Sequence, residues 1–190
     1  PFFLNLWYYT VHTPIQAKQE KIKKYETKAR AMGLNTVQTF EEGDFFPCEH
    51  KKTQRIVRRL IQSDPVYAAM IESLDENVGK LLDTLVETGQ TEDTVIIFFS
   101  DNGGLATSEG SPTCNAPLAE GKGWMYEGGS REPLLVKWPG NVAPGSICET
   151  PITSTDFYPT LLEMAGLDLI PEQHKDGFSL VPLLTGSGAL

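Results

Sequence analysis

One apolar run with an abrupt polar end constrains this chain more than any other segment. Residues 94–99 (TVIIFF) show no polar alternation, and such a run is typical of a strand that is buried on both faces. Strands of this kind occur in parallel sheets that helices cover on both sides. The run therefore predicts an α/β fold with a mostly parallel sheet flanked by helices.

The residues directly after this run, Ser100-Asp101-Asn102-Gly103-Gly104, have a chemistry of their own. In open α/β sheets, ligands bind just beyond the carboxyl ends of the strands, so Asp101 and Asn102 would lie at such a site. A carboxylate beside an amide oxygen suits Ca²⁺ or Mg²⁺ better than a soft metal. Asp, Asn and Gly are also the residues of ordinary turns. The segment alone fits either a cation site or a turn.

Local signals predict the other elements. Asp64 followed by Pro65 is a typical helix start, and apolar residues then recur with helical spacing up to Gly89. A helix followed by a core strand is the order expected in α/β proteins. The remaining expectations are strands over residues 2–8 and 133–138, helices over 16–31, 51–62 and 155–165, and a helical turn over 179–184.

Size, charge and cysteine content exclude several classes of protein. With 190 residues, 40% of them hydrophobic, the chain can form one good core. A net charge of −9 argues against a nucleic-acid partner, which needs a basic surface. No apolar stretch has the length of a membrane span. Three widely spaced cysteines without a Cys-x-x-Cys motif indicate neither a disulfide framework nor a zinc site.

Two more polar residues stand where a site would form. Residues 103–130 are rich in glycine and weakly patterned, and a connection of that length is usually functional. Within it, Lys122 lies between Gly121 and Gly123, and His12 follows the first predicted strand. A cation, a lysine and a histidine together suit hydrolysis of a tetrahedral oxyanion ester. Taken singly, the histidine also fits a structural role and the lysine an exposed surface position.

Six segments of the chain carry a further signal, and they are residues 3–14, 67–75, 99–103, 121–133, 155–162 and 176–180. Each segment alone has little specificity, but their order over nearly the whole chain is much more specific. Taken together, the six segments give the chain a close resemblance to the sulfatases, a branch of the alkaline phosphatase superfamily.

The resemblance implies an alkaline-phosphatase-like fold and assigns roles to four residues. Asp101 and Asn102 look like two ligands of the family's divalent cation, usually Ca²⁺ with Mg²⁺ as an alternative. Lys122 matches the lysine that contacts the sulfate, and His12 the histidine near the ester oxygen. The implied partner is a sulfated small molecule or glycan, and the implied location is periplasmic, extracellular or lysosome-like. Oligomeric state is not indicated. Within residues 126–133, Glu127 and Arg131 are expected to brace the loop as an ion pair.

The family's nucleophile is a formylglycine made from Cys or Ser in a Cys/Ser-x-Pro-x-Arg motif. None of Cys48, Cys114 and Cys148 lies in such a motif. The family's paired N-terminal acids are also missing. We therefore expect residues 1–190 to be a partial catalytic domain, without the nucleophile region and the small C-terminal domain, and inactive alone. The alternatives are a phosphodiesterase or phosphonate hydrolase of the same superfamily, and a non-catalytic sulfatase-like binding module.

Overall fold

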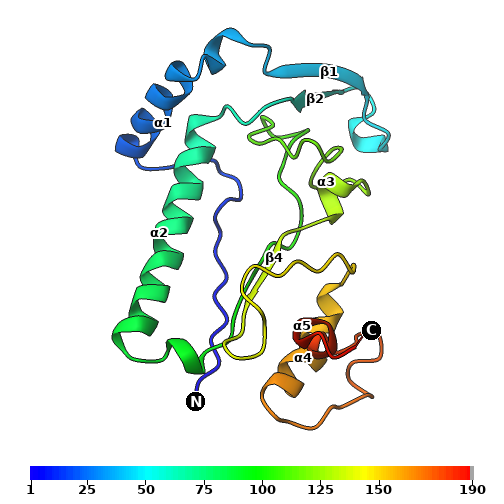
Figure 1. Ribbon diagram of the computed structural model, residues 1–190. Coiled ribbons are helices and arrows are strands. Elements are labelled where there is room, and N and C mark those ends of the chain that lie inside the picture. Colours follow the sequence, from blue (N-terminus) through cyan, green and yellow to red (C-terminus); the bar gives the residue numbers. More distant parts are fainter. Residues whose placement is uncertain (189–190) are drawn as a thin grey trace. The chain divides into compact units, whose positions relative to one another are not determined.

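The computed structural model describes residues 1–188 and divides the chain into two compact units. The first unit holds residues 1–91 and 99–134, and the second holds residues 92–98 and those from 135 onward. The elements are α1 (Gln19–Ala31), β1 (Phe40–Phe45), β2 (Arg55–Arg59), α2 (Pro65–Glu87), β3 (Ile96–Phe99), α3 (Glu127–Ser130), β4 (Leu134–Lys137), α4 (Phe157–Met164) and α5 (Val181–Thr185), shown in Figure 1.

Helix α2 is the longest element of the first unit, and its predicted start is confirmed. The Asp64 carboxylate accepts hydrogen bonds from the amides of Val66 (2.9 Å) and Tyr67 (3.1 Å), which have no partner within the helix. Helix α1 lies along α2 (Figure 1) and is held there by ion pairs. Lys21 Nζ is 2.6 Å from Glu76 and Lys24 Nζ is 2.6 Å from Glu72.

The helix predicted over residues 51–62 is wrong. This region contains β2, which pairs antiparallel with β1 so that Phe40 faces Arg59 and Glu42 faces Val57. The basic residues of this region are spaced like those of a solvated helix face, yet Arg55, Arg58 and Arg59 lie in the strand, and Arg55 and Arg58 each have a carboxylate partner. Ile56 between them is the buried residue of the strand. A strand of five residues is too short for its alternation to outweigh that charge pattern.

The strand predicted over residues 2–8 is also wrong. These residues have no regular secondary structure, and their apolar side chains are exposed, with Trp7 at 85%. A strand is completed by main-chain hydrogen bonds to a neighbour, so strand-like composition alone does not form one. Among the described residues, none pairs with this segment as a strand.

The strand predicted from the apolar run at residues 94–99 and the strand predicted over 133–138 are confirmed in position as β3 and β4, which pair with each other. Burial of the first on both faces is not observed, since Phe99 is 48% exposed. The described residues form two sheets of two strands each. The larger, mostly parallel sheet stays a prediction.

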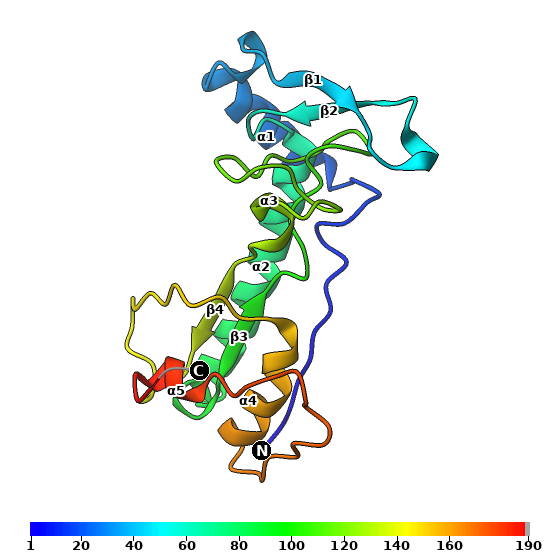
Figure 2. The same ribbon diagram turned by 90° about the vertical axis from the view of Figure 1, so that its right-hand side faces the viewer.

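In the second unit, Asp156 organises the start of α4. Its carboxylate accepts from the amides of Thr153 (2.8 Å) and Phe178 (2.9 Å), and Thr160 Oγ1 accepts from the amide of Leu180 (2.8 Å). These bonds hold α4 against α5 (Figure 2). Residues 155–162 and 176–180 therefore share one structural role, which is to join these two helices. No helix within residues 1–188 combines the length and apolarity needed to cross a membrane.

Replacing Asp64 with alanine is expected to lower the free energy of unfolding by about 1–2 kcal/mol, because two amides of the first turn of α2 lose their acceptor. Urea unfolding followed by far-ultraviolet circular dichroism measures the change. Asp83→Ala, at an exposed position of the same helix, is the control and is expected to change stability by less than about 0.5 kcal/mol. An equal effect of both variants would refute the capping role.

Candidate functional site

Asp101 and Asn102 begin a tight turn at the end of β3. Ser100 Oγ donates to the carbonyl of Asn102 at 2.9 Å, and the Asn102 amide nitrogen donates to the carbonyl of Gly103 at 3.0 Å. Since the nitrogen of the Asn102 side chain is used in this way, its Oδ1 is the end that a cation can approach. Asp101 is exposed and Asn102 is half-buried.

Main-chain packing between glycines places this turn against the glycine-rich loop. A Cβ atom on Gly103 would lie 1.7 Å from the carbonyl oxygen of Gly128, and one on Gly121 would lie 2.2 Å from that of Gly104. Distances this short leave no room for a side chain, so the two segments approach as closely as they do only because both carry glycine. The amide of Lys122 donates to the carbonyl of Gly104 at 3.1 Å. The lysine and the Asp-Asn turn are thereby held in one local framework.

Asn115 links the same two segments through its side chain. Its Oδ1 accepts from the amide of Gly104 (3.2 Å), and its Nδ2 donates to the carbonyls of Gly104 (2.8 Å) and Glu120 (2.9 Å). The side-chain amide of Asn115 thus pairs with both the N–H and the C=O of Gly104, as the main chain of a neighbouring strand would. Sequence reasoning did not identify Asn115, because its partners lie in two separate segments and no local pattern signals them.

The side chains of Lys122 and His12 meet. Lys122 Nζ is 2.8 Å from His12 Nε2, although the two residues are 110 positions apart. An ammonium group only donates, so Nε2 must be the acceptor and the neutral imidazole carries its proton on Nδ1. Nδ1 in turn lies 2.9 Å from the carbonyl oxygen of Thr13 and donates to it. The structure therefore brings together the two residues predicted to act on the anion.

Glu132 lies close enough to Asp101 for their charges to interact. Burial raises the pKa of the Glu132 carboxyl, and the negative charge of Asp101 raises it further. Within residues 1–188, its buried Oε1 has no hydrogen-bond partner. The carboxylate of Asp101 and the side-chain oxygen of Asn102 are the types of oxygen donor that could hold a hard divalent cation such as Ca²⁺. The described residues contain no group of three or more His, Cys, Asp or Glu side chains that could hold a metal.

Arg58 in β2 braces the loop just before Lys122. Its guanidinium makes a two-pronged contact with Glu120, with Nη2 at 2.6 Å and Nε at 2.9 Å from Oε1, and the Glu120 side chain is only 11% exposed. The hydrogen bonds to Glu120 raise the pKa of Arg58. Glu120 has a left-handed backbone (φ 59°), which its ion pair and the Asn115 contact help to hold.

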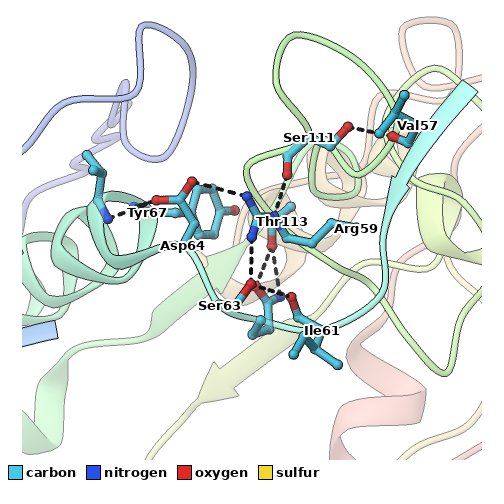
Figure 3. Close-up of polar contacts among 10 residues, drawn as sticks. Val57, Arg59, Ile61, Ser63, Asp64, Tyr67, Ser111 and Thr113 are labelled. Carbon is cyan, nitrogen blue, oxygen red and sulfur yellow. Dashed lines mark hydrogen bonds and ion pairs between the residues drawn. The ribbon is translucent and has the colours of Figure 1, made fainter. Parts of the chain in front are cut away.

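Arg59, the next residue of β2, braces a different part of the loop (Figure 3). Its guanidinium donates to the carbonyl of Ser111 (Nε, 2.5 Å), to Ser63 Oγ (Nη1, 2.6 Å) and to Asp64 Oδ2 (Nη2, 3.4 Å). The side chain is 8% exposed, and this burial lowers the pKa of Arg59. The residue that caps α2 therefore also holds the arginine that fixes residue 111.

One further expectation concerns the loop's own contacts, and the structure adds two more observations. The Glu127–Arg131 ion pair is confirmed at 3.4 Å. Trp124 packs the loop down, because its Nε1 donates to Thr107 Oγ1 at 2.9 Å and its ring stacks on Phe46 at 6.1 Å. Met125, by contrast, is exposed.

Comparison with known proteins places this geometry in context. A family model described as Sulfatase matches residues 1–167. A sulfatase of Formosa agariphila is 35% identical over 195 residues, which cover 97% of this chain and 30% of the relative. Human arylsulfatase A is 44% identical over 115 residues, covering 60% of this chain and 22% of that protein. The crystal structure of Ps i-CgsB in complex with k-i-k-neocarrahexaose matches with a TM-score of 0.65 at 32% identity, covering 91% of this chain and 31% of that one. The chain thus spans about a third or less of the relatives it matches.

Gly121→Ala is expected to lower the free energy of unfolding by about 1–3 kcal/mol, because the added methyl group collides with the carbonyl of Gly104 and with Asn115. Gly79→Ala in α2 is the matched control, since nothing lies within 4 Å of its added carbon. It is expected to stabilise by about 0.5–1 kcal/mol. Urea unfolding measures both variants, and changes of the same sign would count against the packing argument.

Glu132→Gln is expected to make the chain more stable than the native sequence at neutral pH. A carboxyl whose pKa is raised in the folded state binds its proton more tightly there than when unfolded. Its contribution to the free energy of unfolding is therefore lost as pH rises through that pKa, and glutamine removes this loss. Urea unfolding from about pH 4 to about pH 8 tests it. Glu87→Gln, at an exposed position, serves as control, and a profile unchanged by Glu132→Gln would exclude the buried-carboxyl account.

Proposed function

The chain belongs to the sulfatase family, and on that premise we propose that it carries part of the active site of an enzyme that hydrolyses sulfate monoesters. The observation that carries the proposal is the contact between Lys122 and His12 beside the Asp101–Asn102 turn. It joins a compact positive charge, an imidazole and two oxygen ligands within one unit of the chain.

Lys122 is the residue that binds the anion. Its ammonium group would exchange the neutral acceptor His12 Nε2 for a sulfate oxygen, and a hydrogen bond between two charged groups is the stronger of the two. The close main-chain packing around Gly121 fixes the backbone from which this side chain extends. The ammonium is thereby aimed before substrate binds, which lowers the cost of organising the site.

His12 is placed to serve the leaving alcohol. With Nδ1–H donated to the carbonyl of Thr13, the proton that the imidazole can gain and release is the one on Nε2. A proton held on Nε2 can pass to the alcohol oxygen as the sulfur–oxygen bond breaks. The same Thr13 hydrogen bond persists in the imidazolium form, so the ring keeps its orientation through the transfer.

Asp101 and Asn102 would hold the divalent cation, with Ca²⁺ favoured over Mg²⁺. When bound, such a cation neutralises charge on the non-bridging oxygens of the ester. The cysteines do not fit the formylglycine motif: Cys48 is followed by Glu49, Cys114 by Asn115 and Cys148 by Glu149. We therefore propose that residues outside this chain supply the nucleophile and the remaining cation ligands, and that the 190-residue chain alone does not turn over.

The substrate we propose is a sulfated small molecule or glycan. The support is the similarity to Ps i-CgsB, whose crystal structure contains k-i-k-neocarrahexaose, and to human arylsulfatase A. We also propose that the protein acts outside the cytoplasm, which the resemblance to the sulfatases implies.

The test uses the complete gene product that contains these residues, assayed with 4-nitrophenyl sulfate. Lys122→Met is expected to lower kcat/KM by about 10²–10³-fold, the loss typical of removing one preorganised donor to a developing anion. Lys23→Met, at an exposed position of α1, is expected to leave the rate unchanged.

The same assays separate the alternatives. Hydrolysis of a phosphodiester or phosphonate ester without hydrolysis of a sulfate ester would favour the phosphoryl-transfer enzymes of this superfamily. Binding of a sulfated ligand without turnover by the complete product would favour a non-catalytic module. Full activity of Lys122→Met would overturn the role given to that residue.

A further inference from the structure

Residues 109–111 form a short left-handed stretch that the proposed function does not use. Glu109, Gly110 and Ser111 have φ values of 52°, 87° and 47°. Glycine adopts this conformation freely, but for glutamate and serine it costs energy and persists only where the surroundings impose it.

Contacts from β2 impose it here (Figure 3). Ser111 Oγ donates to the carbonyl of Val57 at 2.6 Å, and the carbonyl of Ser111 accepts from the buried guanidinium of Arg59 at 2.5 Å. The amide of Ser111 donates to the carbonyl of Ser108 at 2.9 Å and closes the turn. Ser111 is itself buried. A rigid strand therefore fixes one end of the turn on which Glu109 is carried.

The side chain of Glu109 reaches the segment that carries His12. Glu109 Oε2 accepts a hydrogen bond from Thr13 Oγ1 at 3.1 Å, and the same Oγ1 lies 3.3 Å from His12 Nδ1. A hydroxyl group has one proton to donate. While it donates that proton to Glu109, it cannot donate to Nδ1.

We propose that Glu109 is a positioning residue for His12. By accepting the Thr13 hydroxyl, it keeps His12 in the Nδ1–H tautomer, with Nε2 turned toward Lys122. The catalytic meaning of this rests on the proposed function, whereas the tautomer is a property of the chain itself.

Loss of the Glu109 carboxylate removes the acceptor that holds the proton of the Thr13 hydroxyl. The Thr13 hydroxyl is then free to donate to His12 Nδ1, which can accept only without its own proton. The imidazole must in that case carry its proton on Nε2, where it faces the Lys122 ammonium. Two donors that face each other repel, so the contact between Lys122 and His12 breaks.

Long-range ¹H–¹⁵N correlation spectra of the 190-residue chain, recorded at rising pH until the imidazole signals no longer change, report the tautomer directly. His12→Gln identifies the His12 signals among those of the three histidines. The native chain is expected to show Nδ1–H. Glu109→Gly removes the carboxylate and relieves the left-handed strain, so the thermal midpoint should hold or rise while His12 shifts to Nε2–H. Glu109→Gln keeps an acceptor oxygen and is expected to restore Nδ1–H.

The double variant Glu109→Gly with Thr13→Val is the decisive control. Without the hydroxyl nothing competes for Nδ1, and the Thr13 carbonyl should again hold its proton, so the Nδ1–H tautomer should return. If His12 keeps Nδ1–H in Glu109→Gly alone, or keeps Nε2–H in the double variant, the positioning role is overturned.

Kinetics of the complete gene product test the catalytic consequence. Glu109→Gly is expected to lower kcat about tenfold for an alkyl sulfate, whose alcohol needs a proton to leave, and less than about twofold for 4-nitrophenyl sulfate, with KM unchanged in both. An equal loss on both esters would indicate general damage and overturn the catalytic consequence. If the native product hydrolyses no sulfate ester, the proposed function fails, and the tautomer experiment still decides the role of Glu109.

Discussion

The candidate site depends on main chains that touch without side chains between them. Gly103 and Gly104 lie against Gly121 and Gly128 so closely that a single added carbon at Gly103 would fall within 1.7 Å of a carbonyl oxygen. Because of this contact, the turn that carries Asp101 and the loop that carries Lys122 share hydrogen bonds through Gly104. Asp101 and Lys122 lie in no helix or strand, and of these four glycines only Gly128 belongs to one, the short helix α3, so the placement of the two segments comes mainly from this packing.

Two consecutive arginines carry the rigidity of the β1–β2 hairpin into that loop. Neighbouring residues of a strand point to opposite faces, so Arg58 and Arg59 reach different parts of the same connection. Arg58 holds Glu120, two residues before Lys122, and Arg59 holds Ser111, two residues after Glu109. Both anchored positions have left-handed backbones. The hairpin thus stabilises the two strained points from which the polar groups around His12 are presented.

The sequence predicted what depends on local pattern. Helix α2 follows from its cap at Asp64, and β3 and β4 follow from short apolar runs. The sequence analysis also expected His12 and Lys122 at one site, and the structure places their side chains in contact; the roles given to them belong to the proposed function. The hairpin was missed because its five-residue second strand is mostly charged, and the pairing that decides it is not local. Asn115 and Glu109 were missed for a related reason: each is a polar residue in a loop, and what it contacts lies in separate segments or 96 residues away.

The candidate site has two sides of opposite charge. Lys122 with His12 favours an anion, and Asp101 with Glu132 favours a cation. On one side, the full positive charge of Lys122 has the neutral Nε2 of His12 as its acceptor, which is a weaker partner than an anion. On the other, Asp101 and Glu132 repel each other, and part of Glu132 is buried without a hydrogen bond among the described residues. An anion improves the first side and a cation improves the second. Under the proposed function, a divalent cation held at Asp101 and a sulfate oxygen held by Lys122 would improve both sides together, whereas either ion alone would leave one side unimproved. Binding of the two is therefore expected to be mutually reinforcing, with the Gly104 hydrogen bonds keeping the two sides in register.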